Sequence, residues 1–183
     1  IGDLMFDLGG VRVGFEICED AWNRSHIASS QTRGQADLLL NPSASHFAFG
    51  KYATVRSIVA EGSRLGQAVY LYANLLGNEA GRLIFDGGLF VASNGRVVTE
   101  NRRFSFSQVN LLSAVVDLRA NRLERRRHNY PLRHDPLPHS AGAPVRDTVS
   151  VPFTPLESHG EALTQTGTSP LLGKHEEFTR AVA

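Results

Sequence analysis

The sequence predicts an α/β fold, because segments typical of buried strands alternate with segments typical of helices. Two short, continuous apolar runs cover residues 36–41 and 68–74, as expected of strands that are covered on both faces of a sheet. Between them, residues 51–67 carry apolar side chains at close to helical spacing, with Gly66 as a plausible end of the helix. A strand, a helix and a second strand in this order are typical of an α/β domain.

Another strand is predicted before this unit, at residues 11–18, where a buried apolar run follows the turn sequence Leu-Gly-Gly. This run ends at Cys18, the only cysteine in the chain, and two acids follow it at once. The polar residues 23–35 that come next predict a loop and a short helix.

Consecutive strands are predicted after the unit, over residues 82–101. They are joined at a Gly-Gly pair and at Asn94-Gly95, and Asn-Gly readily supplies the positive φ angles of a hairpin turn. The apolar residues of the segment 108–118 predict a last strand.

The character of the sequence changes after this point. Residues 119–173 hold seven of the eight prolines and show little periodicity, which predicts a long extended connector. The basic run at residues 122–136 is interpreted as a solvated surface and not as a nucleic-acid site, because no interleaved aromatic residues accompany it. Residues 174–183 predict the first turns of a helix with acids near its start, where the helix dipole favours them.

Composition restricts the classes of function open to the chain. The net charge of +1 gives no global reason to expect a nucleic acid or a membrane surface as a partner. No apolar run approaches the ~20 residues that a membrane-spanning helix needs. A single cysteine can form neither an internal disulfide nor a thiolate metal cage. We therefore expect no bound metal, and a reducing, cytoplasmic setting.

Cys18 is either an inert core residue or a nucleophile held at the end of a strand. A sharp turn after a strand can present a thiol at the rim of a sheet, with the next N–H group placed to bind a developing oxyanion. The polar cluster at residues 41–45 would reach the same edge of a parallel sheet. However, no histidine or lysine precedes Cys18, and a thiol needs a nearby base or cation to become a thiolate at neutral pH. The residues alone leave both interpretations open.

Three blocks of sequence resemble the carbon–nitrogen hydrolase (nitrilase) superfamily, and more narrowly the glutamine-hydrolysing domains of glutamine-dependent NAD⁺ synthetases. They are GFEICEDAW at 14–22, NPSASHFAFGK at 41–51, and residues 69–98 with their FDGG turn. The closing HEEFTRAVA agrees with the same family. The resemblance covers about residues 2–118.

The resemblance implies a four-layer α–β–β–α sandwich, of which this chain would hold a part. Residues 1–118 would be the C-terminal part of the glutaminase domain, and residues 119–173 the connector. Residues 174–183 would begin the first helix of the synthetase domain.

The resemblance also implies roles for four residues. Cys18 would be the nucleophile that attacks the side-chain amide of glutamine, and the backbone N–H of Glu19 would contribute to the oxyanion hole. Ser45 and Lys51 would hold the glutamine substrate. Without the resemblance, the favoured interpretation of Ser45 is a turn cap, and that of Lys51 is a solvated residue at the start of a helix. The nearby acids Glu16 and Asp20 receive no catalytic role.

One departure from the family pattern bears on activity. The family uses a Glu–Lys–Cys triad with the glutamate and lysine upstream of the cysteine, whereas the two lysines of this chain, Lys51 and Lys174, both lie downstream. We therefore expect the other two triad members to lie outside this chain, and the segment alone to be inactive.

The resemblance implies no cofactor for this segment, and ATP and Mg²⁺ for the synthetase domain. That domain would receive ammonia from the glutaminase domain through an internal tunnel. The full-length enzyme would be a homo-oligomer. Two alternatives remain open: a stand-alone amidase or nitrilase of the same superfamily, and a non-catalytic sandwich scaffold.

Overall fold

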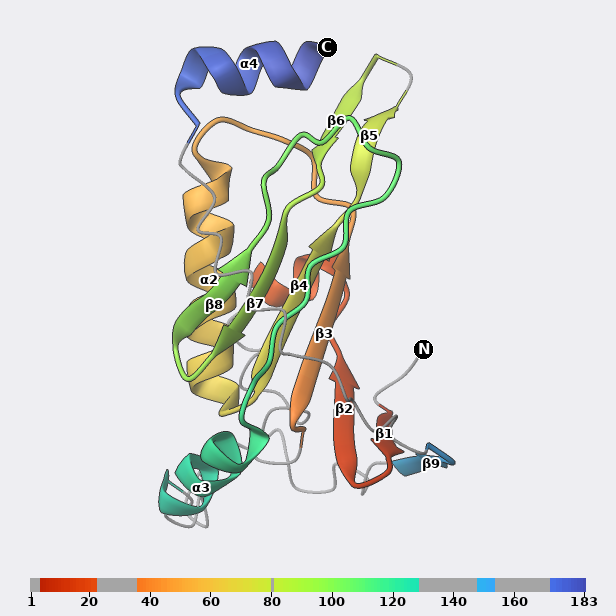
Figure 1. Cartoon of the computed structure of the whole chain (residues 1–183), viewed down its shortest axis with the longest axis vertical. Coiled ribbons are helices and arrows are strands. Elements are labelled where there is room, and N and C mark those ends of the chain that lie inside the picture. The colour runs from red at the N-terminus through yellow and green to blue at the C-terminus, as the bar shows by residue number, and fades with distance from the viewer. Residues whose placement is uncertain (1–3, 23–35, 80, 129–147, 154–171) are drawn as a thin grey trace, which may run out of the picture.

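The computed structural model describes residues 4–22, 36–79, 81–128, 148–153 and 172–183. Its centre is a seven-stranded sheet with the order β8-β7-β4-β3-β2-β1-β9 (Figure 1). Strands β2 (Val11–Phe15), β3 (Leu38–Ser43) and β4 (Val69–Asn74) are parallel neighbours. The mixed α/β fold predicted from the sequence is confirmed.

The remaining strands extend this parallel centre on both sides. On one side, β4 pairs antiparallel with β7 (Leu89–Ser93), which pairs antiparallel with β8 (Arg96–Glu100). On the other side, β1 (Met5–Leu8) pairs antiparallel with β2 and parallel with β9 (Thr148–Val151). A separate two-stranded sheet of β5 (Leu76–Glu79) and β6 (Leu83–Asp86) projects beyond the end of β4 (Figure 1).

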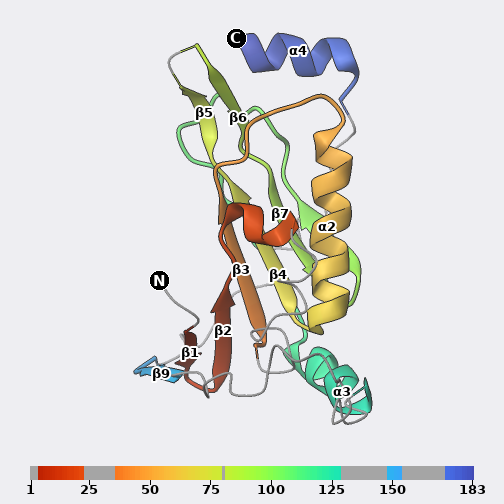
Figure 2. The same cartoon turned by 180° about the vertical axis from the view of Figure 1, so that it is seen from behind.

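Helix α2 (Lys51–Gly66) covers one face of the sheet, packing against β4, β7 and β8 (Figure 2). Its fully buried Val59 joins Leu39 and Tyr70 in the main hydrophobic core. The close approach of α2 to β4 requires a glycine at position 62, since a Cβ there would lie 2.9 Å from a ring carbon of Tyr70. The helix was predicted correctly, although the left-handed residue that ends it is Gln67 and not Gly66.

Two other helices lie at opposite ends of the sheet in Figure 1. Helix α3 (Leu118–His128) lies beyond the start of β3. Helix α4 (Lys174–Val182) lies beyond the start of α2, at the same end of the molecule as the β5–β6 hairpin. The described residues thus supply a sheet and one helix-covered face of the four-layer arrangement expected above.

The structure corrects several predicted elements. The strand predicted at 11–18 ends at Phe15, and the predicted consecutive strands at 82–101 are β6, β7 and β8, of which β6 belongs to the small sheet. The last strand predicted at 108–118 is absent, because no described strand pairs with this segment. Several of its apolar side chains point into solvent instead: Val109, Leu111 and Val115.

The predicted extended connector is also partly wrong. Its first ten residues belong to α3, which is held on the sheet by Arg122 and Arg125 through their bonds to the buried carboxylate of Asp37. Residues 148–151 form β9. The rest of the connector and the loop predicted at 23–35 lie outside the described residues, apart from a few flanking positions.

Candidate active site

Cys18 occupies a tight turn directly after β2. It begins a short 3-10 helix, η1 (Cys18–Trp22), and its φ angle of 49° lies in the left-handed region. Asp20 fixes the turn from both sides: its carboxylate accepts the N–H of Ile17 at 2.8 Å, and its own N–H donates to the carbonyl of Ile17 at 3.0 Å. A non-glycine residue in this conformation costs roughly 1–3 kcal/mol and is typical of functional sites.

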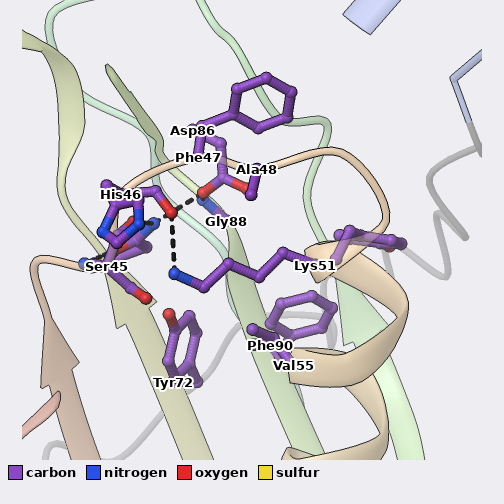
Figure 3. Close-up of a pocket in the computed structure, with 12 residues that line it drawn as sticks. Ser45, His46, Phe47, Ala48, Lys51, Val55, Tyr72, Asp86, Gly88 and Phe90 are labelled. Atoms are coloured by element: carbon purple, nitrogen blue, oxygen red, sulfur yellow. Dashed lines mark hydrogen bonds between the residues drawn. The ribbon is translucent and has the colours of Figure 1, made fainter. Parts of the chain in front are cut away.

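A pocket lies beyond the C-terminal ends of β3 and β4, beside this turn. Figure 3 shows Ser45, Lys51 and Tyr72 facing one another across it. The pocket is narrow, with a free volume of about 10 Å³, which is space for roughly one water molecule. The ends of parallel strands are where ligands commonly bind in sheets of this kind.

Lys51 points into this pocket although it is the first residue of α2. The left-handed Gly50, with a φ of 78°, precedes it and turns the chain into the helix. The ammonium donates to the carbonyl oxygen of His46 at 2.8 Å (Figure 3). It also lies 5.6 Å from the ring centroid of Trp22 in η1. This placement argues against a purely solvated helix start.

Ser45 is held in the pocket through its backbone by one side chain. The N–H of Ser45 donates to Asn74 Oδ1 at 2.8 Å, and Asn74 Nδ2 donates to the carbonyl of Ser45 at 2.9 Å. The same Nδ2 donates to Asp86 Oδ1 at 2.7 Å, so both amide hydrogens of Asn74 are used. This clamp leaves the hydroxyl of Ser45 available for contacts within the pocket.

Tyr72 connects the pocket to the cysteine turn. Burial raises the pKa of Tyr72 to about 12, and the charges of Asp86 and Cys18 add to this, whereas side-chain hydrogen bonds with Ser43 and Ser45 oppose it. The hydroxyl therefore stays neutral near pH 7 and can both donate and accept a hydrogen bond. Its ring packs against Phe90, with 5.9 Å between centroids.

A series of hydrogen bonds between buried polar side chains lies in the core below the turn at Cys18. Tyr70 donates its hydroxyl hydrogen to Glu16 at 2.6 Å and accepts a bond from Asn41 at 3.1 Å. Asn41 in turn accepts a bond from Ser43 at 2.5 Å. Burial, which has the largest effect, and the charge of Glu16 raise the pKa of Tyr70 above its ordinary value. Glu16 is thus engaged in a buried structural network, two residues before Cys18.

The structure brings the predicted residues Cys18, Ser45 and Lys51 to one edge of the sheet, and places Glu19 within η1. Their chemical roles stay predictions. Sequence reasoning missed Tyr72 and Asn74, although two polar side chains at the end of an apolar strand were the signal that could have found them.

Two kinds of functional feature are absent from the described residues. They contain no group of three or more His, Cys, Asp or Glu side chains arranged to hold a metal ion. Among them there is also no helix whose length and apolar character would let it span a lipid bilayer.

No protein-family model matches this sequence. A glutamine-dependent NAD(+) synthetase of Mus musculus is 30% identical over 117 residues, covering 64% of this chain and 16% of the mouse protein. A putative enzyme of the same name from Schizosaccharomyces pombe is 28% identical over 118 residues, covering 64% of this chain and 17% of that protein. The chain therefore spans only about a sixth of the length of these relatives.

The solved structures that resemble this chain include an enzyme of the same name as the sequence relatives. The crystal structure of a glutamine-dependent NAD(+) synthetase from Cytophaga hutchinsonii matches with a TM-score of 0.53 and 45% identity, over 60% of this chain and 17% of that chain. The chain is similar in sequence to glutamine-dependent NAD⁺ synthetases over about two thirds of its own length. A carbon–nitrogen hydrolase from Helicobacter pylori matches with a TM-score of 0.58 over 69% of this chain and 47% of that chain. At 20% identity this second match shows the shared fold alone.

The predicted resemblance is therefore confirmed for both sequence and fold. The candidate site lies at the ends of β3 and β4 and at the start of α2.

Proposed function

We propose that this chain is part of the glutamine-hydrolysing domain of a glutamine-dependent NAD⁺ synthetase, with Cys18 as the nucleophile. The observation that carries the proposal is the left-handed turn at Cys18, which stands at the same sheet edge as a pocket containing Ser45 and the inward-pointing ammonium of Lys51. The homology to named synthetases supports the choice of substrate.

In the proposed reaction, the Cys18 thiolate attacks the side-chain carbonyl carbon of glutamine, and the new S–C bond pushes an electron pair onto oxygen. The N–H of Glu19 stabilises this oxyanion. Collapse of the adduct breaks the C–N bond, and the leaving nitrogen takes up a proton and departs as ammonia. Water then hydrolyses the thioester, which releases glutamate and restores the thiol.

The α-carboxylate and ammonium of glutamine need partners in the pocket, and Ser45 and Lys51 are the proposed ones. Free glutamine is larger than the present free volume, so the Lys51 ammonium must leave the carbonyl of His46 and turn to the carboxylate of the substrate. An exchange of this kind opens the space that Lys51 now fills.

The longer enzyme would supply what this chain does not. The family pattern assigns the glutamate base and the triad lysine to residues upstream of this sequence. ATP and Mg²⁺ would bind in the synthetase domain, where ammonia arriving through a tunnel amidates deamido-NAD⁺. We further propose a homo-oligomeric enzyme of the cytoplasm. No step at Cys18 uses ATP or a metal ion.

The proposal is tested by Cys18→Ala in the full-length protein that contains this chain. Synthesis of NAD⁺ with glutamine should be abolished, whereas synthesis with added ammonium salt should be largely retained, because only the source of ammonia depends on the thiol. The ammonium assay of the same variant serves as the control for folding. Glutamine hydrolysis at the parental rate would show that Cys18 is a core residue.

A further inference from the structure

Five residues connect the pocket to helix α4 through an unbroken series of hydrogen bonds: Ser45, Asn74, Asp86, Arg103 and Glu177. We call them the α4 network. We propose that Arg103, anchored by Glu177, is a positioning residue for glutamine binding that fixes Ser45 through Asp86 and Asn74. The inference rests on the proposed function, because it assigns Ser45 to substrate.

At the pocket end of the network, hydrogen bonds that share the side chains of Asn74 and Asp86 hold the backbone of Ser45. Asn74 clamps both backbone groups of Ser45 and donates to Asp86 Oδ1 at 2.7 Å. The same carboxylate oxygen accepts the N–H of Gly88 at 3.1 Å, at the turn between β6 and β7. A displacement of Asp86 would therefore shift Asn74, and with it the backbone of Ser45.

The other carboxylate oxygen of Asp86 accepts a bond from Arg103 at 3.4 Å. Only 3% of the Arg103 side chain is exposed, and its guanidinium lies 4.2 Å from the ring centroid of Tyr52, a residue that lines the pocket. A buried guanidinium needs anionic partners, and removal of one leaves its charge poorly compensated. Arg103 has two such partners, Asp86 and Glu177.

Glu177 provides the second anion from a segment 74 positions further along the chain. Its side chain is 11% exposed and bonded to Arg103, whereas that of its neighbour Glu176 is 47% exposed and pairs with Arg102 and Arg180. Helix α4 therefore presents one buried and one exposed glutamate side by side. Only the buried one reaches the pocket through the α4 network.

The matched pair of glutamates allows a sharp test in the full-length protein. Glu177→Ala should raise the KM for glutamine in ammonia release about five- to tenfold, with kcat changed less than twofold. Glu176→Ala should leave both parameters unchanged. Alanine favours helix in each case, so α4 itself is preserved. A merely structural role would lower the fraction of active enzyme, and hence kcat, without changing KM.

A second variant and a second readout make the outcome decisive. Arg103→Lys cannot bridge two carboxylates, so it should raise KM to a similar extent, and combining it with Glu177→Ala should add little further. Hydrogen exchange of the peptide 43–49 should be faster in Glu177→Ala than in Glu176→Ala. An unchanged KM in an enzyme that hydrolyses glutamine would overturn the inference alone. Equal hydrogen-exchange rates of the peptide 43–49 in Glu177→Ala and Glu176→Ala would also overturn the inference. If the parent protein released no ammonia from glutamine, the proposed function itself would fail.

Discussion

Replacement of Lys51 by alanine should weaken glutamine binding by an amount that follows from the structure. The ammonium already donates to the neutral carbonyl of His46 at 2.8 Å. A hydrogen bond with one charged partner contributes about 1.5–3 kcal/mol, and the bond from the ammonium to this carbonyl is already of that kind. When the substrate carboxylate replaces the carbonyl, the net gain is the added attraction between two opposite charges. This attraction is about 1–2 kcal/mol at a site open to water, near the lower end of the range from about 1 kcal/mol in water to about 4 kcal/mol at a protein surface. This corresponds to roughly a five- to thirtyfold rise in KM.

The catalytic constant should fall much less than this, because the carboxylate contact is the same in the ground and transition states. The assay is ammonia release by the full-length protein over a range of glutamine concentrations. Lys51→Arg, which keeps the charge, serves as the control and should recover part of the affinity. If Lys51→Ala left KM unchanged, the ammonium would have no role in binding and our argument from its inward orientation would be wrong.

Three further predictions concern stability and assembly. Asp37→Asn should lower the free energy of unfolding by about 3–5 kcal/mol in urea titration, because buried Arg125 loses its anion. The control Glu124→Gln, which changes a half-buried glutamate paired with an exposed arginine, should have a smaller effect. Gly62→Ala should cost about 1–3 kcal/mol in the same measurement, since its Cβ would overlap the ring of Tyr70. The chain expressed alone should self-associate in size-exclusion chromatography, because apolar side chains of the segment 105–117 are exposed. It should also release no ammonia from glutamine, because the family's glutamate and lysine are expected outside this chain. A monomer in size-exclusion chromatography, or measurable ammonia release, would contradict the corresponding prediction.

Asp37 should also give the parent protein a defined dependence on pH. Burial alone would raise the pKa of its carboxyl, but bonds from Arg122 and the Arg12 N–H, with the charges of Arg122 and Arg125, outweigh this and lower the pKa. A lowered folded-state pKa stabilises the protein above the unfolded value of about 4, and this contribution is lost as pH falls through the folded value. Asp37→Asn should therefore show a smaller loss of stability below pH 4 than the parent.

The parts of the fold that could be predicted are those whose pattern is local. The apolar runs of β3 and β4 and the helical spacing of α2 each record burial in consecutive residues. Helix α3 carries no such pattern, because it is strongly basic and is held by the bonds of its arginines to Asp37, far away in sequence. The segment 108–118 shows the opposite error, since an apolar run does not form a strand without a partner.

In the candidate site, too, residues in local motifs could be predicted from the sequence, whereas residues brought together by the fold could not. Cys18, Ser45 and Lys51 lie in short motifs and were named from sequence. Arg103 and Glu177 could not be, because their meeting depends on how α4 lies against the end of the sheet. Nothing in the sequence near Glu177 distinguishes it from the exposed Glu176 beside it.

The central claim is that Cys18 forms a thioester with the acyl group of glutamine. The most direct measurement is mass spectrometry of the full-length protein, quenched in acid during turnover with glutamine and digested. We predict a γ-glutamyl adduct on the peptide that contains Cys18, and its loss in Cys18→Ala. An adduct on another residue, or ammonia release from glutamine without any adduct on this peptide, would contradict the claim.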